Sequence, residues 1–114
     1  MIPVQDIEIS AENGKKMRIM LRSHGGGFFV SLQELITDGS FAGLYSDFSS
    51  PLFRFCDART AFEYGVKSLL VYLSYSSDVI SKVNNPCNCE LLSDMDQQSV
   101  LNGLGVSAVP TVNQ

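Results

Sequence analysis

The chain is poor in the side chains that carry most enzyme chemistry. Its 114 residues include one histidine, three cysteines and no tryptophan. Any Ser-His-Asp or Cys-His scheme would have to use His24, which stands beside three glycines in a turn-like segment, where a solvated polar residue is common. We therefore expect a non-enzymatic protein that needs no cofactor.

Long apolar runs are also missing. No stretch approaches the roughly 20 residues that cross a bilayer, and the first residues lack the basic and then apolar pattern of a signal peptide. An odd number of cysteines without a secretion signal indicates free thiols in a reducing compartment. We expect a cytoplasmic protein with no membrane partner.

Two of the cysteines, Cys87 and Cys89, form the most reactive-looking pair in the sequence. Their single intervening residue fits poorly with the spacing of structural zinc sites, and no second pair exists. We predict no metal site and keep a thiol-based, redox or metal-linked role for this pair as an alternative function. Cys56 is expected to be a buried, inert thiol.

What the chain does have is the composition of one ordinary globular domain. Hydrophobic residues make up 45% and charged residues 18% of the sequence. The net charge of −4 argues against nucleic acid as the partner, because nucleic-acid binding usually demands a basic surface.

Residues 4–36 have the alternation of an antiparallel meander. A two-residue turn at Asn13 and Gly14 would set Glu8 opposite Ile19 and mix polar with apolar side chains on one face. A three-residue loop at 12–14, with Gly14 left-handed, pairs Ile9 with Met17 and keeps the faces separate. Burial of a whole face outweighs a turn preference, so we predict the three-residue loop.

A short alternating strand at Phe53–Phe55 then leads into a helix-start residue, Asp57. Apolar residues at helical spacing predict a main helix at 57–73. The loop at 37–51 has room for a short extra strand. The predicted core is Ile7, Ile9, Met17, Ile19, Phe53, Phe55, Phe62, Val66, Leu69 and Leu70.

The pattern weakens after this helix. Residues 78–83 either extend it or begin a second one, and Ser93 as a cap predicts a short helix at 93–104. We divide the chain into an α+β domain at 1–83 and a tail at 84–114. The predicted fold class is α+β, an antiparallel meander of three to four strands with the main helix packed on one face.

Half of the basic residues fall between positions 15 and 22. Those on the outer face of the second strand would meet an acidic partner or an RNA backbone, or be solvated beside Asp6 and Glu8. Apolar side chains also project from that face. The tentative partner-binding residues are Lys16, Arg18, Met20, Arg22 and Phe29.

The layout from Lys16 through Gly25-Gly26-Gly27 to Leu35, followed by the helix from Asp57 to Leu73, is similar to the HicB antitoxin family, over about residues 16–73. That family has alternating strands, a glycine turn and an amphipathic helix with an Ala-rich opening. The resemblance implies a β-β-β-α module with one covering helix, and an antitoxin role as one alternative function.

Taken together, these features predict a small binding module that acts through protein–protein contacts or self-association as a homodimer. Three alternatives stay open. They are a HicB-like antitoxin component, a protein using the thiols of Cys87 and Cys89, and an RNA-binding module using the basic strand at 15–22.

Overall fold

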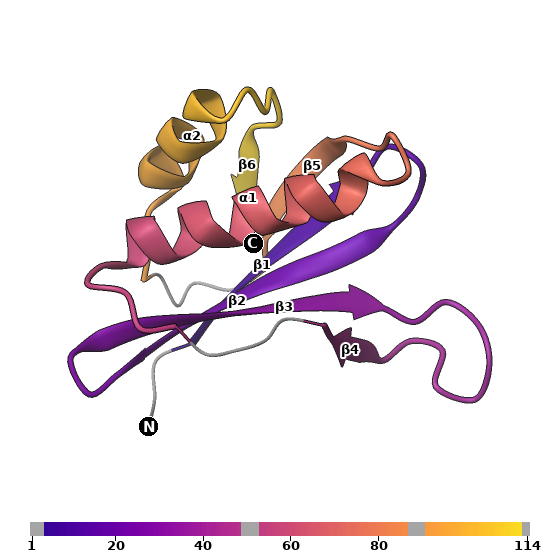
Figure 1. Ribbon diagram of the computed structural model, residues 1–114, viewed down its shortest axis with the longest axis horizontal. Helices are drawn as coiled ribbons and strands as arrows, with labels where there is room; N and C mark the ends of the chain where they lie inside the picture. The colour runs from indigo at the N-terminus through magenta and orange to yellow at the C-terminus, as the bar shows by residue number, and fades with distance from the viewer. Residues whose placement is uncertain (1–3, 49–52, 87–90, 113–114) are drawn as a thin grey trace.

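The computed structural model describes residues 4–48, 53–86 and 91–112, and it shows a six-stranded sheet with two helices (Figure 1). The strand order is β4-β3-β2-β1-β5-β6, and every neighbouring pair is antiparallel except β5 and β6. The α+β class and the antiparallel meander are thus confirmed. The elements are β1 (Val4–Ala11), β2 (Lys16–His24), β3 (Gly27–Leu35), β4 (Tyr45–Asp47), α1 (Ala58–Ser74), β5 (Ile80–Asn85), α2 (Asp94–Gly103) and β6 (Pro110–Val112).

The first hairpin has the predicted register. Ile9 pairs with Met17 and Ile7 with Ile19, and all four side chains are buried. The loop is closed by a hydrogen bond from the Ala11 amide to the Lys15 carbonyl (2.8 Å), and Gly14 has a φ of 99°. A left-handed glycine of this kind ends a three-residue hairpin loop.

The second hairpin turns within two residues. His24 pairs with Gly27, and the intervening Gly25 and Gly26 both have positive φ angles, as a type I′ turn requires. Arg54 lies across this turn and donates a hydrogen bond from Nη2 to the Gly25 carbonyl (2.9 Å). The glycine run therefore builds a tight, capped hairpin.

The main helix begins at Ala58 and is capped by Asp57, whose carboxylate accepts a hydrogen bond from the Thr60 amide (2.7 Å). The helix packs on β2 and β3, where Gly65 allows close approach to Ile19 and Val30. Its fully buried side chains include Phe62, Val66 and Leu69, as predicted, while Leu70 is partly buried.

Residues 53–55 do not form the predicted fourth strand. They contact β3 through a single bridge, between Phe28 and Phe55. The fourth strand is instead β4, the short strand inside the preceding loop, which occupies the other half of the β3 edge. Phe53 therefore does not reach the core: its side chain is 49% exposed and lies against Tyr64, with ring centroids 5.7 Å apart.

Residues 80–85 are a strand, so neither helical interpretation of the 78–83 segment is correct. The helix ends in a turn in which Ser77 has a φ of 54° and the Asp78 amide bonds to the Leu73 carbonyl (3.0 Å). The chain then pairs antiparallel with β1, with a register shift between Ser10 and Ala11.

The C-terminal segment packs onto the rest of the protein. The boundary drawn after Val83 falls within β5, and β6 extends the sheet beside it. α2 stands where the 93–104 pattern predicts a helix, with Ser93 as its cap. Leu92, Val100, Leu101 and Val106 join the core cluster.

Three buried amide side chains connect this segment to the sheet. Gln5 on β1, Asn85 on β5 and Gln97 on α2 have at most 3% of their surfaces exposed. Gln97 and Asn85 exchange two hydrogen bonds of 3.0 Å, and Gln5 Oε1 accepts from the amides of Leu91 (2.7 Å) and Leu92 (2.8 Å). We refer to Gln5, Asn85 and Gln97 as the amide cluster.

Both helices lie on the same side of the sheet (Figure 1). Among the described residues, no helix or strand is stacked on the opposite side, which we call the open face. No helix in the described ranges is long and apolar enough to cross a membrane.

Candidate functional site

The five predicted partner-binding residues all project from the open face. Lys16, Arg18, Met20 and Arg22 alternate with the buried residues of β2, and Phe29 pairs with Arg22 from β3. Each of these residues and its register partners on the neighbouring strands form a row that runs perpendicular to the strands. Alternation along β2 and β3 places these residues on one face, while the rows depend on how the other strands pair.

One row is polar across five of the six strands. We call Asn84, Glu8, Arg18, Gln33 and Asp47 the polar row, because each is the register partner of the next. Asn84 donates a hydrogen bond to Glu8 (2.9 Å), and Arg18 donates to Gln33. The row is thus fixed by contacts within the protein.

Arg18 is the most constrained cation on this face. It forms an ion pair with Asp6, at 3.9 Å, and its guanidinium lies over the ring of Tyr45, 4.1 Å from the centroid. Burial raises the pKa of Tyr45, and the carboxylate of Glu8 acts in the same direction. The Tyr45 phenol therefore remains a neutral hydroxyl at physiological pH.

The face is more apolar toward the β2–β3 turn. Val4, Met20 and Phe29 are partly buried there, and Arg22 pairs with both Val4 and Phe29. Arg22 donates to the Ser31 hydroxyl (3.4 Å), and its Nε is buried without a hydrogen-bond partner among the described residues. We call Val4, Met20, Arg22 and Phe29 the apolar end of the open face.

The opposite end of the face holds a pocket with a volume of about 440 Å³. Ser10 pairs with Lys16 on one side and with Lys82 on the other, so a hydroxyl lies between two lysines; we call these three the lysine row. The remaining polar lining comes from Glu8, Tyr45, Asn84 and Thr111.

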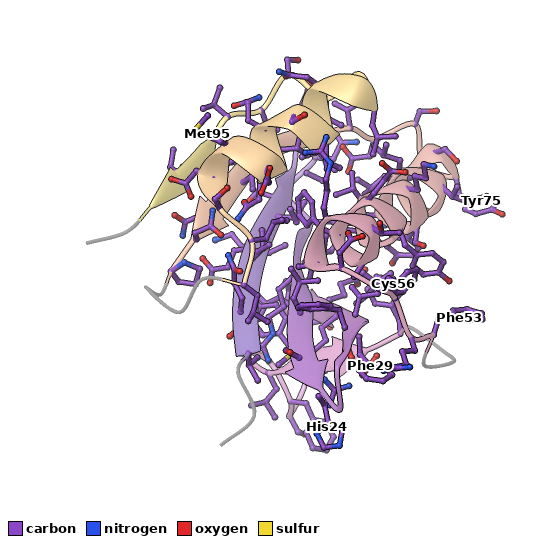
Figure 2. All side chains as sticks on the ribbon, turned by 90° about the vertical axis from the view of Figure 1, so that its left-hand side faces the viewer. His24, Phe29, Phe53, Cys56, Tyr75 and Met95 are labelled. Atoms are coloured by element: carbon purple, nitrogen blue, oxygen red, sulfur yellow. The ribbon has the colours of Figure 1, made fainter. Side chains whose placement is uncertain are left out.

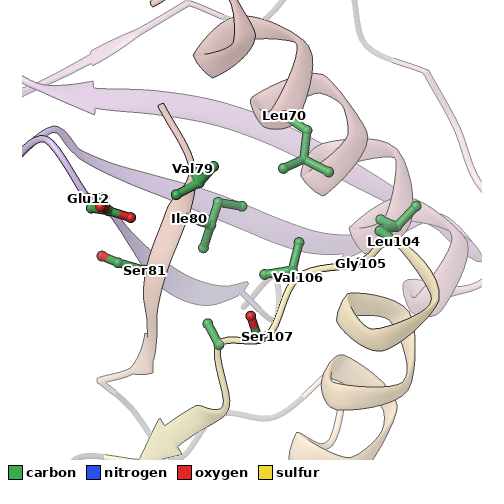
Figure 3. Close-up of a pocket in the computed structure, with 10 residues that line it drawn as sticks. Glu12, Leu70, Val79, Ile80, Ser81, Leu104, Gly105, Val106 and Ser107 are labelled. Carbon is green, nitrogen blue, oxygen red and sulfur yellow. The ribbon is translucent and has the colours of Figure 1, made fainter. Parts of the chain in front are cut away.

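A second pocket, of about 450 Å³, opens between β5, the end of α1 and the loop after α2 (Figure 3). Six of its ten described lining residues are aliphatic, Leu70, Ile80 and Val106 among them, and Glu12 is the one acidic residue of the ten. Among the described residues, no hydrogen bond joins Glu12 to the Ser81 hydroxyl of this lining, which donates instead to the Ser10 carbonyl (3.1 Å).

Two of the other chemical candidates, His24 and Cys56, lie in the described part of the chain. His24 is exposed at the tip of the β2–β3 hairpin, at the opposite end of the protein from α2 (Figure 2). Cys56 is exposed, which corrects the expectation of a buried thiol. Cys87 and Cys89 lie outside the described residues, and the described residues contain no cluster of three or more His, Cys, Asp and Glu that could hold a metal ion.

The basic side chains at 15–22 are less accessible to a partner than their number in the sequence indicates. Lys15 lies on the helix side, with its ammonium 4.7 Å from the Tyr72 ring centroid, and Arg18 is held by Asp6, Gln33 and Tyr45. Lys82 also lies on this face, opposite Ser10, but its segment has the residue spacing of a helix, so the sequence alone does not place it on a sheet.

Comparison of the chain with protein-family models, with curated proteins and with solved structures found no match. The similarity to HicB antitoxins therefore stays a prediction.

Proposed function

We propose that this protein is a non-enzymatic binding module that recognises an acidic segment of another protein through the open face of its sheet. The observation that carries the proposal is the composition of the apolar end. Met, Arg and aromatic residues are the types enriched in protein–protein interfaces, and here Met20, Arg22 and Phe29 adjoin one another.

The charges of the face favour a partner that carries carboxylates. Among the described residues, Lys16, Arg22 and Lys82 form no ion pair, whereas Arg18 on the same face is paired with Asp6 (3.9 Å). The chain as a whole has a net charge of −4, so these cations stand out against an acidic protein. Charge complementarity of this kind speeds association and excludes wrong partners.

RNA is less well supported as the partner. Nucleic-acid surfaces combine several free cations with aromatic side chains that stack on bases. On this face the carboxylates of Asp6 and Glu8 adjoin the basic column, and Arg18 is already paired.

The test is a peptide selection against the folded chain. A library of random twelve-residue peptides, displayed on phage, is selected on the native protein and counter-selected on the double variant Met20→Glu, Arg22→Glu. We expect the surviving peptides to combine acidic with large apolar residues and to lose binding to either single variant. A matched control, Val71→Glu on the exposed side of α1, should bind normally.

Two results would contradict the proposal. One is a set of binders that bind the double variant as well as the native chain. The other is a dimer mass in sedimentation equilibrium that Arg22→Glu converts to a monomer mass, since a second copy would then occupy the face. Binding of a single-stranded RNA probe that depends on Lys16 and Arg22 would favour the nucleic-acid alternative instead.

A further inference from the structure

Lys16 and Lys82 contribute to the charge of the open face in the proposed protein contact, but their arrangement on either side of Ser10 is a separate feature that this contact does not require. Lys16 and Lys82 lie on the same face of the sheet, on the two strands that flank β1, and both pair with Ser10. Because neighbouring strands lie about 4.8 Å apart, the two lysine Cα atoms are roughly 10 Å apart. Two extended lysine side chains can converge over the hydroxyl between them across that distance.

The two ammonium groups lack carboxylate partners. Among the described residues, Arg18, Arg59 and Lys67 each form an ion pair with an acidic side chain, and neither Lys16 nor Lys82 does. The nearest acidic group in the row alongside is Glu8, which already accepts a hydrogen bond from Asn84 (2.9 Å). Two positive charges on either side of one residue repel each other, and an anion between them would offset this repulsion.

The pocket at this row is large enough for more than a single ion. Its volume of about 440 Å³ lies within the range of pockets that hold small organic molecules. Three residues that carry hydroxyl groups, Ser10, Tyr45 and Thr111, line it together with the two lysines. Glu8, also in the lining, would accept from a hydroxyl or amino group of a ligand.

We propose that this pocket binds the oxyanion group, a phosphate or a carboxylate, of a small organic ligand, held by Lys16 and Lys82 on either side of Ser10. Lysine ammonium groups bind phosphate and carboxylate oxygens as compact charges, and the serine hydroxyl donates a further hydrogen bond. The ligand class is therefore an anion that also carries a hydrogen-bond donor within reach of Glu8.

The experiment is an NMR titration of the ¹⁵N-labelled chain at constant ionic strength, with chloride replaced stepwise by inorganic phosphate in one series and by acetate in another. We expect the amide signals of Ser10, Lys16 and Lys82 to shift along saturating curves. Saturation by phosphate points to a phosphate-bearing ligand, and saturation by acetate alone points to a carboxylate.

Single substitutions test whether the anion binds at the lysine row. Lys16→Ala or Lys82→Ala should weaken it by about tenfold or more, the loss expected for one charge-assisted hydrogen bond. Lys16→Arg should retain it, and Lys67→Ala, which removes an ammonium paired with Glu63 on α1, should change nothing. Because both lysines are solvent-facing, the variants should keep the dispersed amide spectrum of a folded chain.

The proposal is overturned by shifts that stay linear in phosphate and are spread over all lysines, or by saturation that survives the double variant Lys16→Ala, Lys82→Ala. The result of the phosphate titration does not depend on whether the proposed protein contact exists. Met20→Glu with Arg22→Glu alters the apolar end alone, so it should abolish peptide binding and leave phosphate binding intact.

Discussion

Replacing Gln97 with alanine should destabilise the protein far more than a surface position of α2 would. The Gln97 side chain is fully buried. Its Nε2 donates to Asn85 Oδ1 (3.0 Å) and to the Leu92 carbonyl (3.2 Å), and its Oε1 accepts from Asn85 Nδ2 (3.0 Å). Three hydrogen bonds would be lost at once.

The cost follows from the groups that would be left unpaired. Asn85 Nδ2 has no other hydrogen-bond partner among the described residues, whereas Asn85 Oδ1 keeps the bond from Gln5 (3.3 Å) and the Leu92 carbonyl keeps another from Gln5 (3.2 Å). One buried donor without a partner costs about 1–3 kcal/mol. The cavity left by the shortened side chain adds to that, so we expect a total of roughly 2–5 kcal/mol.

Urea denaturation of the Gln97→Ala variant measures this cost, with Gln98→Ala as the matched control. Gln98 is the next residue of the same helix, and its amide bonds only to Asn102, at the exposed surface. The control should change the free energy of unfolding by less than about 0.5 kcal/mol. If Gln97→Ala and Gln98→Ala gave the same midpoint and slope, the amide cluster would have no role in stability.

Two further predictions concern α1. Leu69→Ala should lower the free energy of unfolding by about 2–5 kcal/mol, because Leu69 is fully buried, while Val71→Ala, at a position 59% exposed, should be nearly neutral in the same denaturation assay. The Thr60 amide holds the pKa of Asp57 below its usual value, so the stabilisation by this cap is present above the unfolded pKa and is lost as the pH falls through the folded pKa. Asp57→Asn keeps a capping side chain without titrating, so thermal unfolding between about pH 5 and 2 should depend less on pH in that variant; an unchanged dependence would contradict the role of the cap.

The first hairpin was predictable because one physical requirement decides it. Shifting the register by one residue would move Ile7 and Ile9 away from their buried partners, so the three-residue loop is the arrangement that keeps one face apolar. The main helix was predictable for a similar reason, since a capping Asp57 precedes a long apolar repeat.

The strand β5 escaped prediction because a bulge gives it the spacing of a helix. The register shift between Ser10 and Ala11 leaves Ser81 without a cross-strand partner, so Ile80 and Val83 both reach the buried face although they are three residues apart. Three-residue spacing of apolar side chains is the usual mark of a helix. Local pattern alone cannot separate the two cases.

The packing of the C-terminal segment against the sheet was not predictable for a different reason. Its attachment depends on amide side chains, and Gln97 and Asn85 look like solvated residues in a sequence. Burial of such groups is tolerated because nearly all of their hydrogen bonds are made, and the partners come from β1, β5, α2 and the segment that precedes α2. Their pairing is visible only when the fold is known.

The open face shows the same division between local and long-range information. Alternation along β2 was enough to place Lys16, Arg18, Met20 and Arg22 on one side. The lysine row, however, needs the pairing of Ser10 with Lys82, residues separated by most of the chain. A column of a binding surface can thus be derived from a single strand, whereas a pocket that spans several strands requires the strand order, which hydrophobic periodicity does not encode.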